Sequence, residues 1–131
     1  AEVRQDFPGG FKGDKENKFT SAGRTLLENE AFNFVKKLAQ YRKNTPALDN
    51  GKLMQYLPQN NTYVYFRYDA AKTVMVATNP TDQEVSLETN RFSERMAGFT
   101  KARNVLTEEI LNNLTTVKIP AKTAMVLELQ K

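Results

Sequence analysis

The chain has 131 residues, a net charge of +4, no cysteine and no histidine. Its length suits one domain, or one small domain with an appendage, and an apolar core of its own. The missing residue types exclude disulfides, a cysteine zinc site and histidine-dependent nucleophile pairs. Because the charges are scattered and no apolar run approaches the roughly 20 residues of a membrane span, we expect a solvated surface with neither nucleic acid nor a membrane as partner.

The first 23 residues are predicted to form a loop. They hold four of the six glycines and show no sustained period of either kind. Loops of this length are usually functional, disordered or part of something larger. Phe7, Phe11 and Phe19 favour the last of these, because disordered tails are poor in aromatic residues. The acidic residues here match no EF-hand spacing, so no metal site is predicted.

An amphipathic helix is predicted to begin after Thr25, because Thr25 and Glu28 match a capping box. It ends before Pro46, since proline cannot continue a helix. Its apolar stripe recurs at three- and four-residue steps and comprises Leu27, Ala31, Phe34, Leu38 and Tyr41. A second apolar row (Phe32, Val35 and Ala39) widens this face, which indicates that the helix covers more surface than the following strands offer.

After the helix the hydrophobic period changes from that of a helix to that of strands. The predicted strands span residues 61–69, 73–79, 84–88, 101–106, 115–119 and 125–129, with a further strand start near residue 53. Residues 91–99 fit no single element, and residues 107–113 are predicted as a short helix or a turn. Short strands separated by turn signals, without crossover helices, predict an antiparallel sandwich or barrel.

No pair of carboxylates stands out as catalytic, and no glycine-rich loop is placed to bind phosphate. The aromatic and basic residues of one strand, Tyr63, Tyr65, Arg67 and Tyr68, match either a stacking platform for sugars or bases or an ordinary half-buried strand. Arg91, Phe92 and Arg95 form a similar weak cluster. A nucleic-acid-binding surface would use Arg67, Arg91, Arg95, Lys101 and Arg103.

Three stretches together resemble a known family: VRQDFPGGFKGDKENKFT, GRTLLENEAFNFVKKLAQYRKNTPAL and GKLMQYLPQNNTYVYFRY. They resemble the C-terminal third of α-amylase-family (glycoside hydrolase family 13) enzymes, in the neopullulanase and cyclomaltodextrinase subgroup. The specific part is the helix pattern E-x-x-x-x-F-x-x-x-L-x-x-x-R-K-x-x-P-A-L-x-x-G. Its matches are Glu30, Phe34 or Val35 at the aromatic position, Leu38, Arg42, Lys43, Pro46, Ala47, Leu48 and Gly51.

The resemblance implies a mainly β fold, with a loop and one long helix from a (β/α)8 barrel before an antiparallel β-sandwich. Residues 1–50 would be the tail of the catalytic barrel, comprising the loop after its last strand and its final helix. Residues 51–131 would be the C-terminal sandwich domain. The resemblance also implies a periplasmic or extracellular location, while a cytoplasmic one stays open.

The family's catalytic carboxylates lie upstream on barrel strands, so the resemblance implies a part of a longer enzyme that hydrolyses no glycosidic bond alone. The parent would be a retaining hydrolase of α-glucans such as pullulan, cyclodextrins or maltooligosaccharides, within starch degradation. The expected partners are the catalytic barrel and, through it, the α-glucan; no cofactor is expected. Arg4, Asp6 and Phe7 follow the last barrel strand, where barrel enzymes bind substrate, and are the predicted substrate-binding residues.

Three functions therefore stay open. The leading one is a non-catalytic C-terminal part that packs against and stabilises the catalytic barrel. The second is an independent carbohydrate-binding module with Tyr63 and Tyr65 as its platform. The third is a basic nucleic-acid-binding β-domain.

Overall fold

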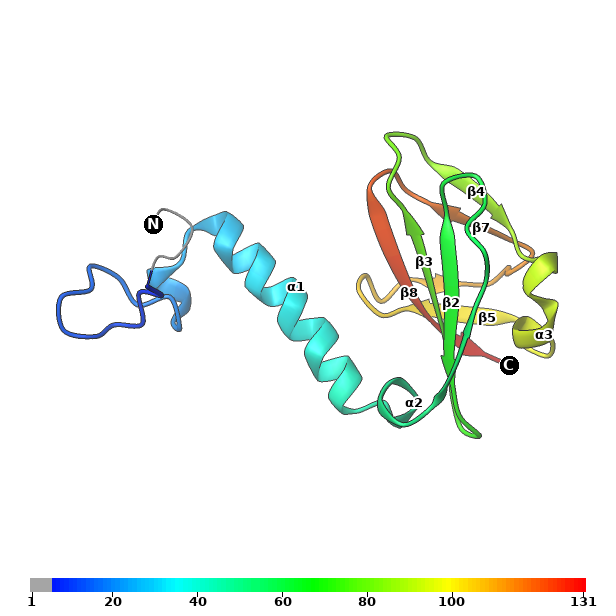
Figure 1. Cartoon of the computed structure of the whole chain (residues 1–131), viewed down its shortest axis with the longest axis horizontal. Coiled ribbons are helices and arrows are strands. Elements are labelled where there is room, and N and C mark those ends of the chain that lie inside the picture. The colour runs from blue at the N-terminus through cyan, green and yellow to red at the C-terminus, as the bar shows by residue number, and fades with distance from the viewer. Residues whose placement is uncertain (1–5) are drawn as a thin grey trace. The chain divides into compact units, whose positions relative to one another are not determined.

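A computed structural model describes residues 6–131 of the protein (Figure 1). The chain separates into two compact units, one up to Lys37 and the other comprising Leu38–Lys131. The boundary falls within helix α1 (Leu26–Lys43). Each unit therefore has to be explained by its own contacts.

The N-terminal loop is ordered by its own hydrogen bonds. Gly9 and Asn17 form an antiparallel bridge, and the Lys18 amide donates to the Pro8 carbonyl at 2.8 Å. After a 3-10 turn, η1 (Ser21–Gly23), the Arg24 guanidinium donates from Nη1 to the Lys18 carbonyl at 2.8 Å. The prediction of a long loop before the helix is confirmed for residues 6–20, and these bonds explain how a stretch without a regular period holds one shape.

Helix α1 begins as predicted. The Thr25 amide donates to Glu28 Oε2 at 2.7 Å, and the Glu28 amide donates to Thr25 Oγ1 at 3.3 Å, which completes the capping box. The helix ends at Lys43, and Pro46 then begins a second short helix, α2 (Pro46–Asp49), which the sequence analysis did not predict. Proline suits the first turn of a helix because its missing N–H has no partner there in any case.

Eight strands form two antiparallel sheets. The larger sheet has the order β1-β2-β3-β8-β5-β6, and β4 pairs with β7 in the second. Their bounds are β1 Lys52–Gln55, β2 Tyr63–Tyr68, β3 Thr73–Asn79, β4 Val85–Glu88, β5 Lys101–Asn104, β6 Ile110–Leu111, β7 Thr116–Ile119 and β8 Thr123–Gln130. The predicted mainly β antiparallel sandwich is thereby confirmed, and β3, with β2 and β8 as its neighbours, is one of the two central strands of the larger sheet.

Two predictions in the second half of the chain need correction. The segment expected as a short helix or turn contains β6, in which Leu111 pairs with Ala102 and Ile110 with Arg103. Two residues are too few to show a strand period, so only the pairing reveals this strand. The strand predicted to reach residue 106 ends at Asn104, whose Oδ1 accepts the Leu106 amide at 3.0 Å and so starts a turn.

The unassigned segment of residues 91–99 is helical. It contains the 3-10 turn η2 (Asn90–Phe92) and the single-turn helix α3 (Ser93–Met96). Phe92 and Met96 are both buried, as their helical spacing requires. The segment leaves α3 at Gly98, whose φ of +85° is a left-handed conformation that favours glycine.

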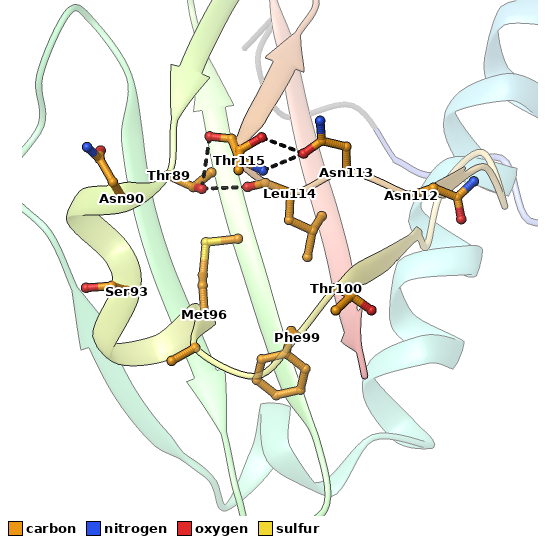
Figure 2. Close-up of a pocket in the computed structure, with 11 residues that line it drawn as sticks. Thr89, Asn90, Ser93, Met96, Phe99, Thr100, Asn112, Asn113, Leu114 and Thr115 are labelled. Carbon is orange, nitrogen blue, oxygen red and sulfur yellow. Dashed lines mark hydrogen bonds between the residues drawn. The ribbon is translucent and has the colours of Figure 1, made fainter.

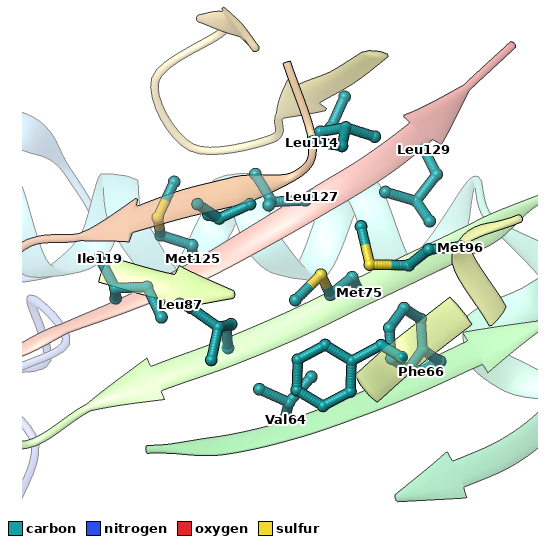
Figure 3. Packing of buried hydrophobic residues seen from close by; sticks show 14 residues of the cluster. Val64, Phe66, Met75, Leu87, Met96, Leu114, Ile119, Met125, Leu127 and Leu129 are labelled. Carbon is teal, nitrogen blue, oxygen red and sulfur yellow. The ribbon is translucent and has the colours of Figure 1, made fainter. Parts of the chain in front are cut away.

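One hydrophobic core lies between the two sheets (Figure 3). Alternate residues of β2, β3, β7 and β8 enter it, as the period of two predicts. Its buried members are Val64, Phe66, Met75, Ala77, Leu87, Phe92, Met96, Ala102, Leu114, Val117, Ile119, Met125, Leu127 and Leu129. This core lies entirely within the unit that comprises Leu38–Lys131.

Among residues 6–131, no helix combines the length and the apolar character needed to cross a lipid bilayer.

Candidate functional site

The predicted substrate-binding residues lie at the start of the N-terminal loop. Arg4 falls outside the described residues, and Asp6 is exposed. The ring of Phe7 lies 4.9 Å from that of Phe19, centroid to centroid, and remains 57% exposed. The structure therefore gives Phe7 a local partner, and the role of these residues toward a substrate stays a prediction.

The N-terminal unit exposes an unusual amount of large apolar side chain. Leu27 on α1 is 74% exposed and Phe11 in the loop is 71% exposed. The other members with more than half of their surface exposed are Phe7, Phe19, Leu26, Phe34 and Val35. Contiguous exposed apolar surface in soluble proteins usually marks an interaction site.

The outer face of the six-stranded sheet, on the side away from the core, is hollowed. The concavity has a volume of about 650 Å³ and is lined mainly by apolar and aromatic side chains, among them Leu38, Leu53, Tyr63, Tyr65, Val76 and Val126. Leu38 and Tyr41 of the α1 stripe are half-buried here. The predicted stripe thus packs against the sandwich at the C-terminal end of α1.

Glu128 anchors this end of α1 to the sheet. Its Oε2 accepts hydrogen bonds from the Tyr41 hydroxyl at 2.7 Å and from Lys72 Nζ at 2.7 Å, and Arg103 Nη2 lies at 3.4 Å. Arg103 also donates from Nη1 to Glu108 Oε2 at 2.7 Å. The carboxylate is 13% exposed and has cationic partners, so its partial burial is compensated.

The same cluster shifts two pKa values in opposite directions. Burial raises the pKa of Tyr41 well above its ordinary value, and the bond to the Glu128 carboxylate raises it further. Burial also opposes ionisation of Glu128, but the hydrogen bonds from Lys72 and Tyr41 outweigh it and hold the pKa of Glu128 below its ordinary value. At neutral pH the pair is therefore a neutral phenol that donates to a carboxylate.

The predicted aromatic platform forms only in part. The rings of Tyr63 and Tyr65 lie 5.6 Å apart and are half-buried in the outer concavity. The Arg67 guanidinium is occupied, because its Nη2 donates to the Asp49 carbonyl at 3.0 Å. Tyr68 lies on the opposite face of the strand, where the Arg95 guanidinium stacks over its ring at 4.3 Å. The hypothesis that all four side chains form one stacking platform is therefore wrong, and the alternative of a half-buried strand fits the structure.

The candidate cations for nucleic acid divide between the two sides of the larger sheet. Arg67 and Arg103 belong to the outer face, where each has the partners described above. Arg91 and Arg95 belong to the helical segment on the core side, and Arg91 Nη2 donates to the Leu57 carbonyl at 3.2 Å. Among the described residues these side chains do not gather into one basic patch, and no group of three acidic residues is placed to hold a metal ion.

A second hollow lies among the segment after β4, helix α3 and the β6–β7 loop (Figure 2). Its volume is about 370 Å³. The Thr89 hydroxyl joins two of these walls, because it donates to the Leu114 carbonyl at 2.5 Å. Thr89, Asn113 and Thr115 are polar, while Met96, Phe99 and Leu114 supply apolar surface. Sequence reasoning missed this hollow because its residues come from two separate stretches of the chain, residues 89–100 and 112–115.

The fold defines the class of protein. An α-amylase from Geobacillus thermoleovorans complexed with acarbose shares it at 17% identity and a TM-score of 0.66, over 76% of this chain and 23% of that chain. AmyP in complex with maltose shares it at 14% identity and a TM-score of 0.69, over 79% and 21%. At such identities the likeness shows the fold alone. The two-sheet β fold of this chain is therefore also the fold of a part of each of these two proteins.

The sequence comparisons define the family. The model of the cyclo-malto-dextrinase C-terminal domain matches residues 53–128, and the chain belongs to that family. It is 32% identical over 94 residues to a cyclomaltodextrin glucanotransferase of Niallia circulans, a match that covers 65% of this chain and 13% of that protein. The predicted relationship to the α-amylase family is confirmed. The chain spans less than a quarter of the length of each of these relatives.

Proposed function

We propose that the chain is the non-catalytic C-terminal part of a longer α-glucan-converting enzyme and stabilises its catalytic barrel by packing against it. The named relatives are a glucanotransferase and structures with acarbose or maltose bound, which supports an α-glucan as the substrate of the longer enzyme. On this proposal residues 1–50 complete the barrel and residues 51–131 form the sandwich behind it. The catalytic carboxylates belong to the remainder of the enzyme.

The exposed apolar surface of α1 and its preceding loop carries this proposal. Leu27 and Phe34 lie seven residues apart on one helix face, and both are more than half exposed. Burial of such side chains stabilises a protein by roughly 2 kcal/mol each, so leaving them in water forgoes a large stabilisation. Their burial against a barrel recovers this stabilisation. The capping box sets the start of the helix by local sequence.

The test compares one pair of substitutions in two settings. Leu27→Ser and Phe34→Ser are introduced together into the longer enzyme and into the 131-residue chain, and the free energy of unfolding is measured with urea. In the longer enzyme we expect a loss of about 3–5 kcal/mol, because two buried apolar contacts disappear. In the chain alone we expect a change below about 1 kcal/mol.

Lys36→Ser is the matched control, because Lys36 is an exposed residue of the same helix, two positions from Phe34, and therefore points away from the stripe. It changes helix propensity similarly without removing apolar surface. Equal small losses for the double variant in both settings would contradict the proposed packing.

We further propose that the predicted residues Arg4, Asp6 and Phe7 bind the substrate of the longer enzyme. Both described residues are exposed at the start of the loop, and an aromatic ring with a neighbouring carboxylate suits stacking on a sugar and bonding to its hydroxyls. Asp6→Ala in the longer enzyme should raise KM for α-glucans several-fold. Unchanged kinetics on maltooligosaccharides, pullulan and cyclodextrins would remove Asp6 from the site, with Asp14→Ala as the matched loop control.

The nucleic-acid alternative remains a prediction. A salt-sensitive change in tyrosine fluorescence on addition of single-stranded DNA would support it. The tyrosine platform is tested by the same signal with maltoheptaose, because Tyr63 and Tyr65 line the outer concavity.

A further inference from the structure

We propose that the hollow between α3 and the β6–β7 loop, which we call the α3 pocket, binds one neutral pyranose unit. The inference rests on the proposed function for the identity of the sugar, but the site itself is argued from its lining. It is separate from the outer concavity that holds Tyr63 and Tyr65, since the two share no residue.

The lining of the α3 pocket contains no charged residue. Its eleven residues are Thr89, Asn90, Ser93, Met96, Ala97, Phe99, Thr100, Asn112, Asn113, Leu114 and Thr115. In a chain whose residues are 26% charged, such a lining favours a ligand without charge. Its volume of about 370 Å³ falls within the roughly 300–1,000 Å³ of small-molecule sites.

The polar groups suit a ligand rich in hydroxyls. An amide side chain both donates and accepts, as a sugar hydroxyl does. Among residues 6–131, the side chains of Ser93, Thr100 and Asn112 have no hydrogen-bond partner. Asn113 uses its Oδ1 to accept the Thr115 amide at 2.9 Å, which leaves its amide nitrogen as a donor. The rim therefore offers donors and acceptors from both walls of the pocket.

The apolar groups suit the carbon-bound hydrogens of a pyranose ring. Met96 and Leu114 are buried at the base, and Phe99 lies beside them as Figure 2 shows. Apolar surface with a few convergent polar groups is the usual composition of a small-molecule site. A ring that lies on this surface keeps its hydroxyls at the rim, which is how one ligand satisfies both parts of the lining.

The pocket is held open by fixed contacts. The Thr89 hydroxyl and amide both donate to the carbonyls of the opposite wall, the amide to Thr115 at 3.1 Å. The Thr100 amide donates to the Gln130 carbonyl at 2.9 Å, which fixes the chain between α3 and β5 to strand β8. A site that is already formed loses less entropy when it binds a ligand.

The experiment uses the methyl group of Met96 as a reporter. The 131-residue chain or the longer enzyme is labelled with 13C-methyl methionine, and the Met96 resonance is assigned with Met96→Leu. Titration with maltose should shift Met96 in a saturable way, with Kd in the range of about 1–10 mM. The resonances of Met54, Met75 and Met125 should stay in place, because these residues do not line the pocket.

Ala97→Trp should abolish the shift, because Ala97 is an exposed lining residue and a tryptophan there fills the pocket without altering the core. Asn112→Ala should weaken binding about tenfold, as expected for a lost hydrogen bond. Ala121→Trp is the matched control at an exposed position elsewhere and should retain binding. Retention in Ala97→Trp, or no shift with any sugar, would overturn the proposal.

Parallel titrations with glucose and cellobiose show whether the pocket is selective for α-glucans. A response to maltose alone supports a site for α-glucan chains, and an equal response to all three supports a site for any single pyranose. A negative titration would not contradict the proposed packing against the barrel. That packing is tested separately, by the stability of the longer enzyme with Leu27→Ser and Phe34→Ser. Failure of that packing equally leaves the pocket testable in the isolated chain.

Discussion

The two units of this chain differ in where their apolar side chains lie. The unit from Leu38 onward buries its large apolar residues between two sheets, and Phe66 at its centre has no exposed surface. The unit before it satisfies its backbone through loop and capping hydrogen bonds but leaves residues such as Leu27 and Phe11 mostly exposed. Local hydrogen bonding therefore fixes a shape in one unit, while hydrophobic burial stabilises the other.

The largest effect should come from the core. Phe66→Ala removes a fully buried aromatic ring and should lower the free energy of unfolding by about 3–5 kcal/mol in urea denaturation of the 131-residue chain. Phe11→Ala in the other unit should change it by less than about 0.5 kcal/mol, because that ring is mostly exposed. Similar losses for the two variants would remove the distinction between the units.

The next effect concerns the anchor of α1 on the sheet. Glu128→Gln should cost about 2 kcal/mol at neutral pH, since a largely buried carboxylate loses its charged hydrogen bonds to Lys72 and Arg103. Because the folded pKa of Glu128 lies below its ordinary 4.5, its contribution is present above pH 4.5 and is lost as the pH falls through the folded value. Urea denaturation at a series of pH values from 7 to 3 measures both the cost of Glu128→Gln at neutral pH and the loss of the Glu128 contribution in acid.

Glu84→Gln serves as the control, because its ion pair with Lys118 is long, at 3.7 Å, and exposed. It should change stability by less than about 0.5 kcal/mol. An equal dependence on acid pH in wild type and Glu128→Gln would show that the cluster does not contribute as described.

Tyr41→Phe should have a smaller effect, about 1 kcal/mol, because one hydrogen bond to Glu128 is lost while the ring remains. The Tyr63 hydroxyl donates to the exposed Gln55 side chain, so Tyr63→Phe should lower the free energy of unfolding by less than Tyr41→Phe does. The raised pKa of Tyr41 means that its contribution is present below pH 10.0 and is lost as the pH rises through the folded value. Burial also raises the pKa of Tyr56, so tyrosinate absorbance should show late-titrating groups, and Tyr41→Phe should remove the one with the larger shift.

The most local effect should be at the start of α1. Thr25→Ala removes the cap that accepts the Glu28 amide and should destabilise the first turns of the helix by about 1 kcal/mol. Hydrogen exchange of the amides in the first two turns measures this loss, and Thr25→Ser should restore protection. An unchanged exchange rate in Thr25→Ala would mean that tertiary contacts, rather than the cap, order this helix.

Much of the fold could be predicted because its signals are local. The capping box at Thr25, the breaker at Pro46 and the alternation along β2 and β8 each lie within a few residues of chain, and all three were confirmed. The α-amylase-family relationship followed from the helix and the junction after it. Of the predicted site, Arg4 lies outside the described residues, and the roles of Asp6 and Phe7 stay predictions that depend on the proposed barrel and its substrate.

The sequence by itself determined the longer elements and their inward faces, because the periods of helix and strand are properties of the backbone. It did not reveal the short elements α2 and β6, which span too few residues to show a period. Only the tertiary structure decided which distant residues meet. Glu128 gathers Tyr41, Lys72 and Arg103, and Thr89 reaches Leu114 to shape the α3 pocket. No local sequence pattern predicts these contacts. They follow from strand order and register, which depend on the burial of the whole core.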